Sequence, residues 1–226
     1  MIAPVSTGRI LAISDIHGCY TTFMALIEQL HLQKSDNLFI TGDMINRGKG
    51  TKKLIKTLIA LKTGGYHIFP IRGNHEEMLI TTFALPTSEL LIRSKKYNNE
   101  WLIDKKDGSI KTEFFKFFVE LPYFYSVDSM YFVHGGFNFS LANPFKNTVS
   151  MLNYRGTYNQ SLLPPAMRIV HGHTPMPFET ITQTIACNER VINIDNGCVL
   201  KNTAYFGNLL CLDAQNMELF VQPNIE

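Results

Sequence analysis

The sequence predicts an α/β fold in one domain, residues 1–226, with a parallel sheet in the first half and a second, mixed sheet in the second half. Three observations predict it. Short apolar runs alternate with amphipathic stretches over residues 10–71, strand-like runs separated by turns follow, and no repeat, low-complexity stretch or linker divides the chain. A chain of 226 residues that is 45% hydrophobic can bury one sizeable core.

The first half follows a β-α-β-α-β pattern. Its apolar runs are short and bounded by polar residues, and between them apolar residues recur at helical spacing. Strands connected by helices in this way pair in parallel. The third strand contains Pro70, which is unfavourable inside a sheet. The expected strands lie at 10–13, 38–40 and 67–71, and the expected helices begin near 20 and 51.

The second half consists of short strand-like runs separated by turns, which predicts a second, largely antiparallel or mixed sheet. These runs lie at 130–133, 168–170, 178–184, 191–194, 208–212 and 217–221. The segment from about 84 to 112 carries several basic residues and Trp101. It fits neither half, and we expect a helical or irregular excursion there.

Composition and charge exclude several classes of protein. With 21 basic and 19 acidic side chains the net charge is +2, so nucleic acid is not favoured as a partner. The four cysteines are widely spaced without a CxxC pair, which indicates reduced thiols. The first residues do not resemble a signal peptide, and no apolar run is long enough to span a membrane. We therefore expect a cytoplasmic protein with no membrane partner.

Unusual polar residues follow the expected strands. SDIHG, TGDMINRG and RGNHE follow the first three strands, and VHGG and VHGHT follow two later ones. The carboxyl ends of strands in an open α/β sheet are where ligands bind. Five loops therefore bring carboxylates, amides and imidazoles to one edge. The side chains concerned are Asp15, His17, Asp43, Asn46, Arg47, Asn74, His75, Glu76, His134, His171 and His173.

These residue types suit a metal centre that acts on phosphate. Asp15 and His17 can bind one cation, and Asp43 could bridge it to a second. Mixed oxygen and nitrogen ligands suit Mn²⁺, Fe or Zn²⁺ better than Ca²⁺. Two metals about 3.5–4 Å apart would polarise a phosphoryl group and lower the pKa of a bridging water, and the hydroxide would attack phosphorus in line. Arg47 could stabilise the developing charge. The further ligands would be Asn74, His134 and His173.

Each residue also has an ordinary explanation. Asp15 alone would be a helix N-cap. His17 and Asn74 alone would be turn residues, and His134 a histidine satisfied near two glycines. All of these explanations would have to hold together, so the ordered set favours the site.

At these motifs the sequence resembles the phosphoprotein phosphatase family of metallophosphoesterases, specifically its short bacterial and phage-type members. The resemblance implies a calcineurin-like fold, in which two mixed β-sheets pack as a sandwich flanked by helices. The dinuclear metal site would lie at the strand C-terminal ends. His75 would be the general acid, and Arg47 and Arg155, the latter in LNYRGTY, would bind phosphate together with Asn74 and His75. The implied ligands are Asp15, His17 and Asp43 for the first metal and Asp43, Asn74, His134 and His173 for the second.

One position departs from the family. Where this chain has Asn46, the family has an aspartate that pairs with the histidine corresponding to His75. An aspartate orients the imidazole and favours its charged form. Asparagine can accept a hydrogen bond but cannot stabilise the cation by charge, so the sequence predicts a weakened acid.

Three functions remain open at this point. The leading expectation is a metal-dependent phosphomonoesterase, a serine/threonine protein phosphatase acting on a phosphoprotein or phosphopeptide, with two divalent metal ions, Mn²⁺ first and Fe or Zn²⁺ as alternatives. The second is hydrolysis of a nucleotide polyphosphate such as diadenosine tetraphosphate. The third is a catalytically weak phosphate-binding regulatory protein, which only Asn46 supports. The excursion would form a peptide groove in the first case and a nucleotide clamp in the second.

Overall fold

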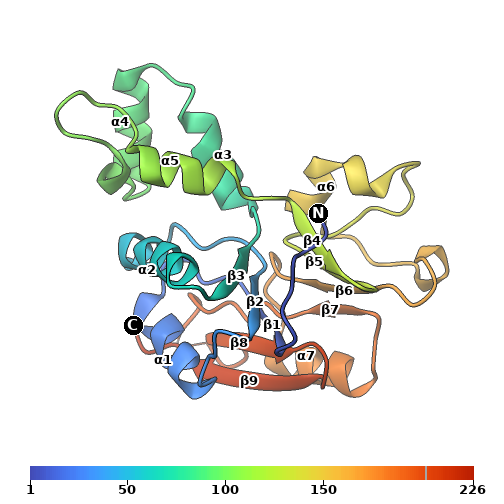
Figure 1. Cartoon of the computed structure of the whole chain (residues 1–226). Coiled ribbons are helices and arrows are strands. Elements are labelled where there is room, and N and C mark those ends of the chain that lie inside the picture. The colour runs from blue at the N-terminus through green and yellow to red at the C-terminus, as the bar shows by residue number, and fades with distance from the viewer. Residues whose placement is uncertain (202) are drawn as a thin grey trace.

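The computed structural model describes residues 1–201 and 203–226 and contains two β-sheets that share a core (Figure 1). The first sheet has the strand order β3-β2-β1-β8-β9. β1, β2 and β3 pair in parallel, whereas β8 is antiparallel to both β1 and β9. The strands are β1 (Ile10–Ile13), β2 (Asn37–Ile40), β3 (His67–Pro70), β8 (Asn208–Asp213) and β9 (Glu218–Pro223).

The second sheet has the order β4-β5-β6-β7. β5, β6 and β7 are parallel, and β4 is antiparallel to β5. Both sheets are therefore mixed, which confirms the expected fold class. The strands are β4 (Phe124–Val127), β5 (Met130–Val133), β6 (Arg168–His171) and β7 (Val191–Asn193).

The hydrophobic core forms three layers because successive residues of a strand point to opposite faces. Leu11 and Ile13 of β1 pack under α1 and α2, while Ala12 packs between the two sheets. In this middle layer, the rings of Phe39 from β2 and Phe132 from β5 stack with centroids 4.1 Å apart. The third layer covers the far side of the second sheet. Strands buried on both faces explain why the sequence shows continuous apolar runs.

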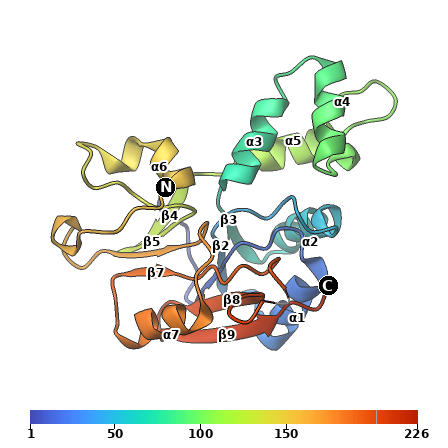
Figure 2. The same ribbon diagram turned by 180° about the vertical axis from the view of Figure 1, so that it is seen from behind.

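Helices α1 and α2 lie against the first sheet, and α7 lies near β7 and β9 (Figures 1 and 2). In the described part of the chain, the helices are too short or too polar to cross a membrane. The helices are α1 (Tyr20–Gln29), α2 (Thr51–Thr63), α3 (Asn74–Thr82), α4 (Thr87–Lys96), η1 (Glu100–Leu102), α5 (Thr112–Val119), η2 (Pro144–Lys146), α6 (Thr148–Asn153), η3 (Gln160–Leu162) and α7 (Phe178–Ala186).

The excursion at 84–112 combines the helix α4 and the short helix η1 with turns and irregular segments. Together with α3 and α5, α4 and η1 project away from the two sheets (green in Figures 1 and 2). The segment is fixed on its inner side by Leu102, which is fully buried, and by Trp101, whose ring meets Phe114 edge to face. Its base adjoins the loops that follow the parallel strands of the first sheet.

Two expectations for the second half were wrong. Residues 208–212 and 217–221 form strands, but they join the first sheet beside β1. Residues 178–184 were expected to form a strand and instead belong to α7. Pro177 precedes this helix, and Ile181 and Ile185 lie four residues apart on its inner face. β-branched residues favour strands, but here the helical spacing of the buried side chains prevails.

Pro70 is accommodated because β3 is an edge strand and Pro70 is its last residue, opposite Ile40.

Candidate metal centre

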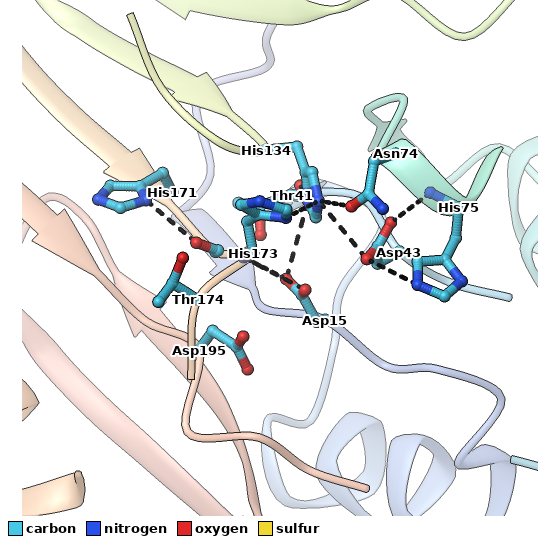
Figure 3. A network of polar contacts seen from close by, with 12 residues as sticks. Asp15, Thr41, Asp43, Asn74, His75, His134, His171, His173, Thr174 and Asp195 are labelled. Carbon is cyan, nitrogen blue, oxygen red and sulfur yellow. Dashed lines mark hydrogen bonds and ion pairs between the residues drawn. The ribbon is translucent and has the colours of Figure 1, made fainter. Parts of the chain in front are cut away.

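The side chains that the sequence singled out at five strand ends converge at one edge of the two sheets (Figure 3). His134, which follows β5, lies at the centre. Its Nε2 is 2.9 Å from Oδ1 of Asn74, 3.0 Å from Nδ1 of His173 and 3.5 Å from Oδ2 of Asp43. Asp43, His134 and His173 thus form a group whose ligand atoms lie within 4.8 Å of one another.

A second group shares the same aspartate. Asp43 Oδ2 lies 3.6 Å from Nε2 of His17 and 3.9 Å from Nε2 of His75. These three side chains again have ligand atoms within 4.8 Å of one another. Asp43 therefore stands between the two groups, as expected for a carboxylate that bridges two cations.

The tautomers of two histidines show that these groups suit cations. Nδ1 of His134 contacts the carbonyl oxygen of Thr41 at 3.0 Å, and Nδ1 of His17 contacts that of Ile45 at 3.0 Å. A carbonyl can only accept, so each Nδ1 carries the proton and each Nε2 presents a lone pair. The lone pair of His134 faces Asn74 Oδ1, and that of His17 faces Asp43 Oδ2. Acceptors that face acceptors repel each other unless a cation lies between them.

Asp15 closes the site from the side of β1. Its carboxylate oxygens accept the backbone N–H of His173 at 3.1 and 3.2 Å. This contact requires glycine at residue 172, because a Cβ there would collide with Asp15 Oδ1. Nε2 of His173 is buried without a hydrogen-bond partner among the described residues. A buried ring nitrogen without a partner is a further sign of a missing ligand.

The backbone at the site is strained. His17 (φ 47°), Asp43 (φ 47°), Asn46 (φ 66°), Arg47 (φ 65°) and His173 (φ 74°) all have left-handed conformations. Residues other than glycine adopt this region rarely, and such residues cluster at functional sites. All five lie in the loops that carry the side chains of the site.

Burial governs the electrostatics of the site. It raises the pKa of Asp43 to about 7 and that of Asp15 above its ordinary range. It also lowers the pKa of His17 and of His134 to about 3, so both imidazoles are neutral and ready to bind a metal. Divalent cations would favour the ionised carboxylates and leave the neutral imidazoles as ligands.

Glu76 holds the loop that carries Asp43. Its carboxylate is fully buried and accepts the backbone N–H groups of Asp43 (2.9 Å), Met44 (2.9 Å) and Ile45 (3.2 Å), and also that of Gly73 (2.9 Å). Glu76 thus fixes the loop after β2 against the start of α3.

Two residues at the site escaped the sequence reasoning. Asp195 is buried, and its pKa is raised to about 7, first by burial and then by the nearby Asp43. It stands two residues after β7, as Asp15 stands two residues after β1, and this shared position was the available signal. Asn99 belongs to the excursion, and no sequence signal connects it with the site.

In the contact between Asn46 and His75, the amide nitrogen and not the amide oxygen faces the imidazole ring. The amide nitrogen of Asn46 lies 2.9 Å from Nδ1 of His75, while its oxygen accepts a hydrogen bond from Asn99 Nδ2 at 2.9 Å. Facing an N–H donor, Nδ1 must accept, and the proton of the neutral ring then resides on Nε2. Burial first, and then the charge of Arg47, lower the pKa of His75 to about 4.

The two arginines lie exposed at the rim of the site. The charge of Arg47 acts on His17 and His75, and Nη1 of Arg155 donates to Thr174 Oγ1 at 3.2 Å, one residue from His173. His171 lies outside both ligand groups, and its Nδ1 contacts the Gly172 carbonyl. The assignment of roles to these residues stays a prediction.

Residues 8–199 match the family of calcineurin-like phosphoesterases. The chain belongs to this family. The match spans the strand-end loops up to Asp195, and the residues that the site brings together fit the divalent metal ions that such a centre implies. The resemblance stated from the motifs is therefore confirmed.

Among curated proteins, the chain is similar to symmetrical bis(5'-nucleosyl)-tetraphosphatases. That of Wigglesworthia glossinidia brevipalpis is 37% identical over 73 residues, which cover 32% of this chain and 26% of the relative. That of Methylobacillus flagellatus is 30% identical over 127 residues, 55% of this chain and 42% of the relative. The phosphoesterase chain thus aligns with less than half the length of these relatives.

Solved structures share the fold over nearly the whole chain. One described as a "putative diadenosine tetraphosphatase" has a TM-score of 0.72 at 17% identity and covers 99% of this chain and 97% of that one. A cold-active protein-tyrosine phosphatase of Shewanella has a TM-score of 0.64 at 16% identity, covering 98% and 83%. A serine/threonine phosphatase of Saccharomyces cerevisiae has a TM-score of 0.61 at 15% identity, covering 97% and 81%. These likenesses establish the calcineurin-like fold.

Proposed function

We propose that the protein is a metal-dependent hydrolase that cleaves the phosphoanhydride of a dinucleoside polyphosphate of the diadenosine tetraphosphate type. The observation that carries the proposal is that the partner of His75 is the amide of Asn46, 2.9 Å from the imidazole Nδ1, and not a carboxylate that could stabilise a charged ring. This contact decides how well the site can protonate a leaving group.

Protonation matters for one substrate class and little for the other. A phosphoserine leaves as an alkoxide, a strong base that needs a proton as the P–O bond breaks. A nucleotide polyphosphate leaves through a terminal phosphate, which is a weak base. With Nδ1 of His75 accepting, loss of the Nε2 proton would leave an imidazolate, so this ring is a poor acid. The site therefore suits the anhydride better than the alkyl ester.

The remaining side chains have roles that fit this chemistry. Asp15, His17, Asp43, Asn74, His134 and His173 would hold two divalent cations, of which Mn²⁺ is our first choice. When bound, such ions supply Lewis-acid polarisation of the phosphoryl group and an activated water. Arg47 and Arg155 bind phosphoryl oxygens at the rim, and His75 donates its Nε2–H to another.

A cleft beside Arg47 supports an extended anionic substrate. It has a volume of about 690 Å³ and is bordered by Arg47, Lys49 and Lys201, with Val199 and Leu200 as apolar neighbours. Glu226 is its acidic member, and that carboxylate accepts backbone N–H groups at the start of α1. Three basic side chains next to apolar ones complement a polyphosphate that carries a nucleoside.

The serine/threonine phosphatase that the motifs first suggested is the second candidate. The intact ligand set and the presence of His75 favour it, because the same parts would serve a phosphopeptide. The curated relatives are named as tetraphosphatases, whereas the phosphatases among the structural neighbours are 15–16% identical and share the fold alone.

The test is a comparison of rates with excess Mn²⁺. Diadenosine tetraphosphate, a phosphoserine peptide and a phosphotyrosine peptide are given to the same preparation, with Asp43→Ala as the blank. We expect kcat/KM for the dinucleotide to exceed that for either peptide by at least about 100-fold, with ADP as a product if cleavage is symmetrical. Faster release from a peptide would make the protein a phosphatase, and binding without turnover of any substrate would favour a regulatory protein.

A further inference from the structure

Asn46 is held from two sides. Its amide nitrogen meets Nδ1 of His75, and its oxygen accepts a hydrogen bond from Nδ2 of Asn99, each at 2.9 Å. Asn99 is 53 residues away along the chain and is only 2% exposed. Its own Oδ1 is buried without a hydrogen-bond partner in the part of the chain that the structure describes.

The excursion holds Asn99 in place. Its backbone N–H donates to the Ser94 carbonyl at 2.7 Å, which closes the end of α4, and its carbonyl accepts from Leu102 N–H at 3.0 Å, which begins η1. The preceding Asn98 turns the chain with φ 56°. With Leu102 fully buried, Asn99 sits on a fixed support and its side chain reaches inward.

We propose that Asn99 is a positioning residue for His75, because through Asn46 it sets whether an amide nitrogen or an amide oxygen faces the imidazole Nδ1. The proposal rests on the role given above to His75 at this centre. It also gives the excursion a function, since its α4–η1 junction forms the outer support of the reacting histidine.

The chain of two amides has two self-consistent arrangements. In the observed one, Asn99 donates to Asn46 and Asn46 donates to Nδ1. If both amides turn over, the orphaned Asn99 oxygen accepts from Asn46, and the Asn46 oxygen accepts from an Nδ1–H. In this arrangement His75 can carry a second proton on Nε2 as an imidazolium. It gives that proton to the leaving oxygen as the P–O bond breaks, and the ring becomes neutral with its remaining proton on Nδ1.

Asn99→Asp tests the proposal, because a carboxylate can only accept and so requires the second arrangement. The substrates are phenyl phosphate, a poor leaving group, and 4-nitrophenyl phosphate, a good one, both with Mn²⁺. We expect kcat for phenyl phosphate to rise about tenfold with KM unchanged, and that for 4-nitrophenyl phosphate to change by less than about twofold. Asn98→Asp places the same charge on the exposed neighbour and should change neither rate.

A second variant keeps the test decisive if a buried carboxylate disturbs folding. Asn99→Leu removes the Nδ2 donor to Asn46 without adding a charge. This substitution is introduced both into the unchanged chain and into the Asn46→Asp variant. In the natural chain it releases Asn46, and phenyl phosphate turnover should rise. Beside an aspartate at 46 it removes a supporting hydrogen bond, and turnover should fall. This reversal of sign is a coupling that a double-mutant cycle measures.

Equal loss of rate on both esters in Asn99→Asp, or a fall in both backgrounds of Asn99→Leu, would show that Asn99 serves the fold alone and would overturn the proposal. The aryl esters separate this outcome from the fate of the proposed substrate. If the protein fails to hydrolyse diadenosine tetraphosphate, the rates on the two aryl esters still test the role of Asn99. If the Asn99 variants change both ester rates equally, the diadenosine tetraphosphate assay still tests the proposed function.

Discussion

At the scale of single residues, the chemistry of the site is set by what each ring nitrogen contacts. The carbonyls of Thr41 and Ile45 fix the protons of His134 and His17 on Nδ1, so both rings turn a lone pair towards the oxygens of the site. Asn46 does the opposite at His75, where it presents a donor. The immediate partners thus prepare His134 and His17 to bind cations and leave His75 as a weak acid.

Asn46→Asp follows from this contrast. An aspartate can accept from both Asn99 Nδ2 and a protonated His75 Nδ1, and it restores a strong proton donor. We expect turnover of phenyl phosphate to rise at least about tenfold, which corresponds to about 1.4 kcal/mol of barrier, with a smaller gain on 4-nitrophenyl phosphate. Steady-state kinetics of the two proteins measure this. Equal rates on the poor leaving group would refute the idea that Asn46 weakens the acid.

At the scale of elements, α3 positions the loop after β2. Asn74, His75 and Glu76 are its first residues, so one helix end supplies a metal ligand, the candidate acid and the buried carboxylate that accepts N–H groups of the Asp43 loop. Glycine at residue 73 allows this loop and helix to meet, because a Cβ there would collide with Asp43 Oδ1. The glycine directly before Asn74, His75 and Glu76 in GNHE is therefore required for packing as well as being part of the motif.

Glu76→Gln should disturb this junction. An amide NH₂ would replace one of the two oxygens that backbone N–H groups now occupy, and a buried donor would face donors. We expect the free energy of unfolding to fall by about 1–3 kcal/mol, and Mn²⁺ affinity to fall about 10- to 100-fold as the Asp43 loop loosens. Urea denaturation and metal titration measure the two effects.

The matched control is Glu89→Gln on α4, where the carboxylate is exposed and pairs with Arg93 at 2.9 Å. This change should alter stability by less than about 0.5 kcal/mol, because exposed ion pairs contribute little. Similar losses in the two variants would contradict a special role for Glu76.

At the scale of the whole molecule, the centre lies where the two sheets and their loops meet. Asp15 and Asp43 come from the first sheet, and His134 and His173 come from the second. Cations bound between them would join the two halves of the core, and they would neutralise carboxylates that burial alone makes costly. Metal binding and global stability should therefore be coupled.

Adding Mn²⁺ to metal-free protein should raise the melting temperature. At a free concentration about 100 times the dissociation constant, binding adds about 2.7 kcal/mol, which for a chain of this size corresponds to about 5–10 °C. Calorimetry with and without a chelator measures the shift. Asp43→Asn should lose most of it, whereas Asp128→Asn, an exposed turn residue, should keep it. An unchanged melting temperature in the natural chain would contradict a metal centre at this position.

The sequence by itself determined the ligand candidates and the parallel start of the fold. Asp15, Asp43 and Asn74 follow three strands that helices connect, and parallel strands necessarily bring their carboxyl ends to one edge. Local residue order was therefore enough to predict a shared site. The same argument would have reached Asp195, which follows β7 in the same way.

Only the tertiary structure decided which strands pair, which faces pack together and which side chains from distant segments meet. Short apolar runs between turns predict β8 and β9 as strands, but they do not predict that these strands join the sheet of β1, because strand pairing depends on contacts distant in sequence. The helix at Phe178–Ala186 likewise depends on what its inner face packs against. Asn99 is the clearest case. Its hydrogen bond to Asn46 spans 53 residues and exists because the excursion folds back over the site, and no local pattern encodes that return.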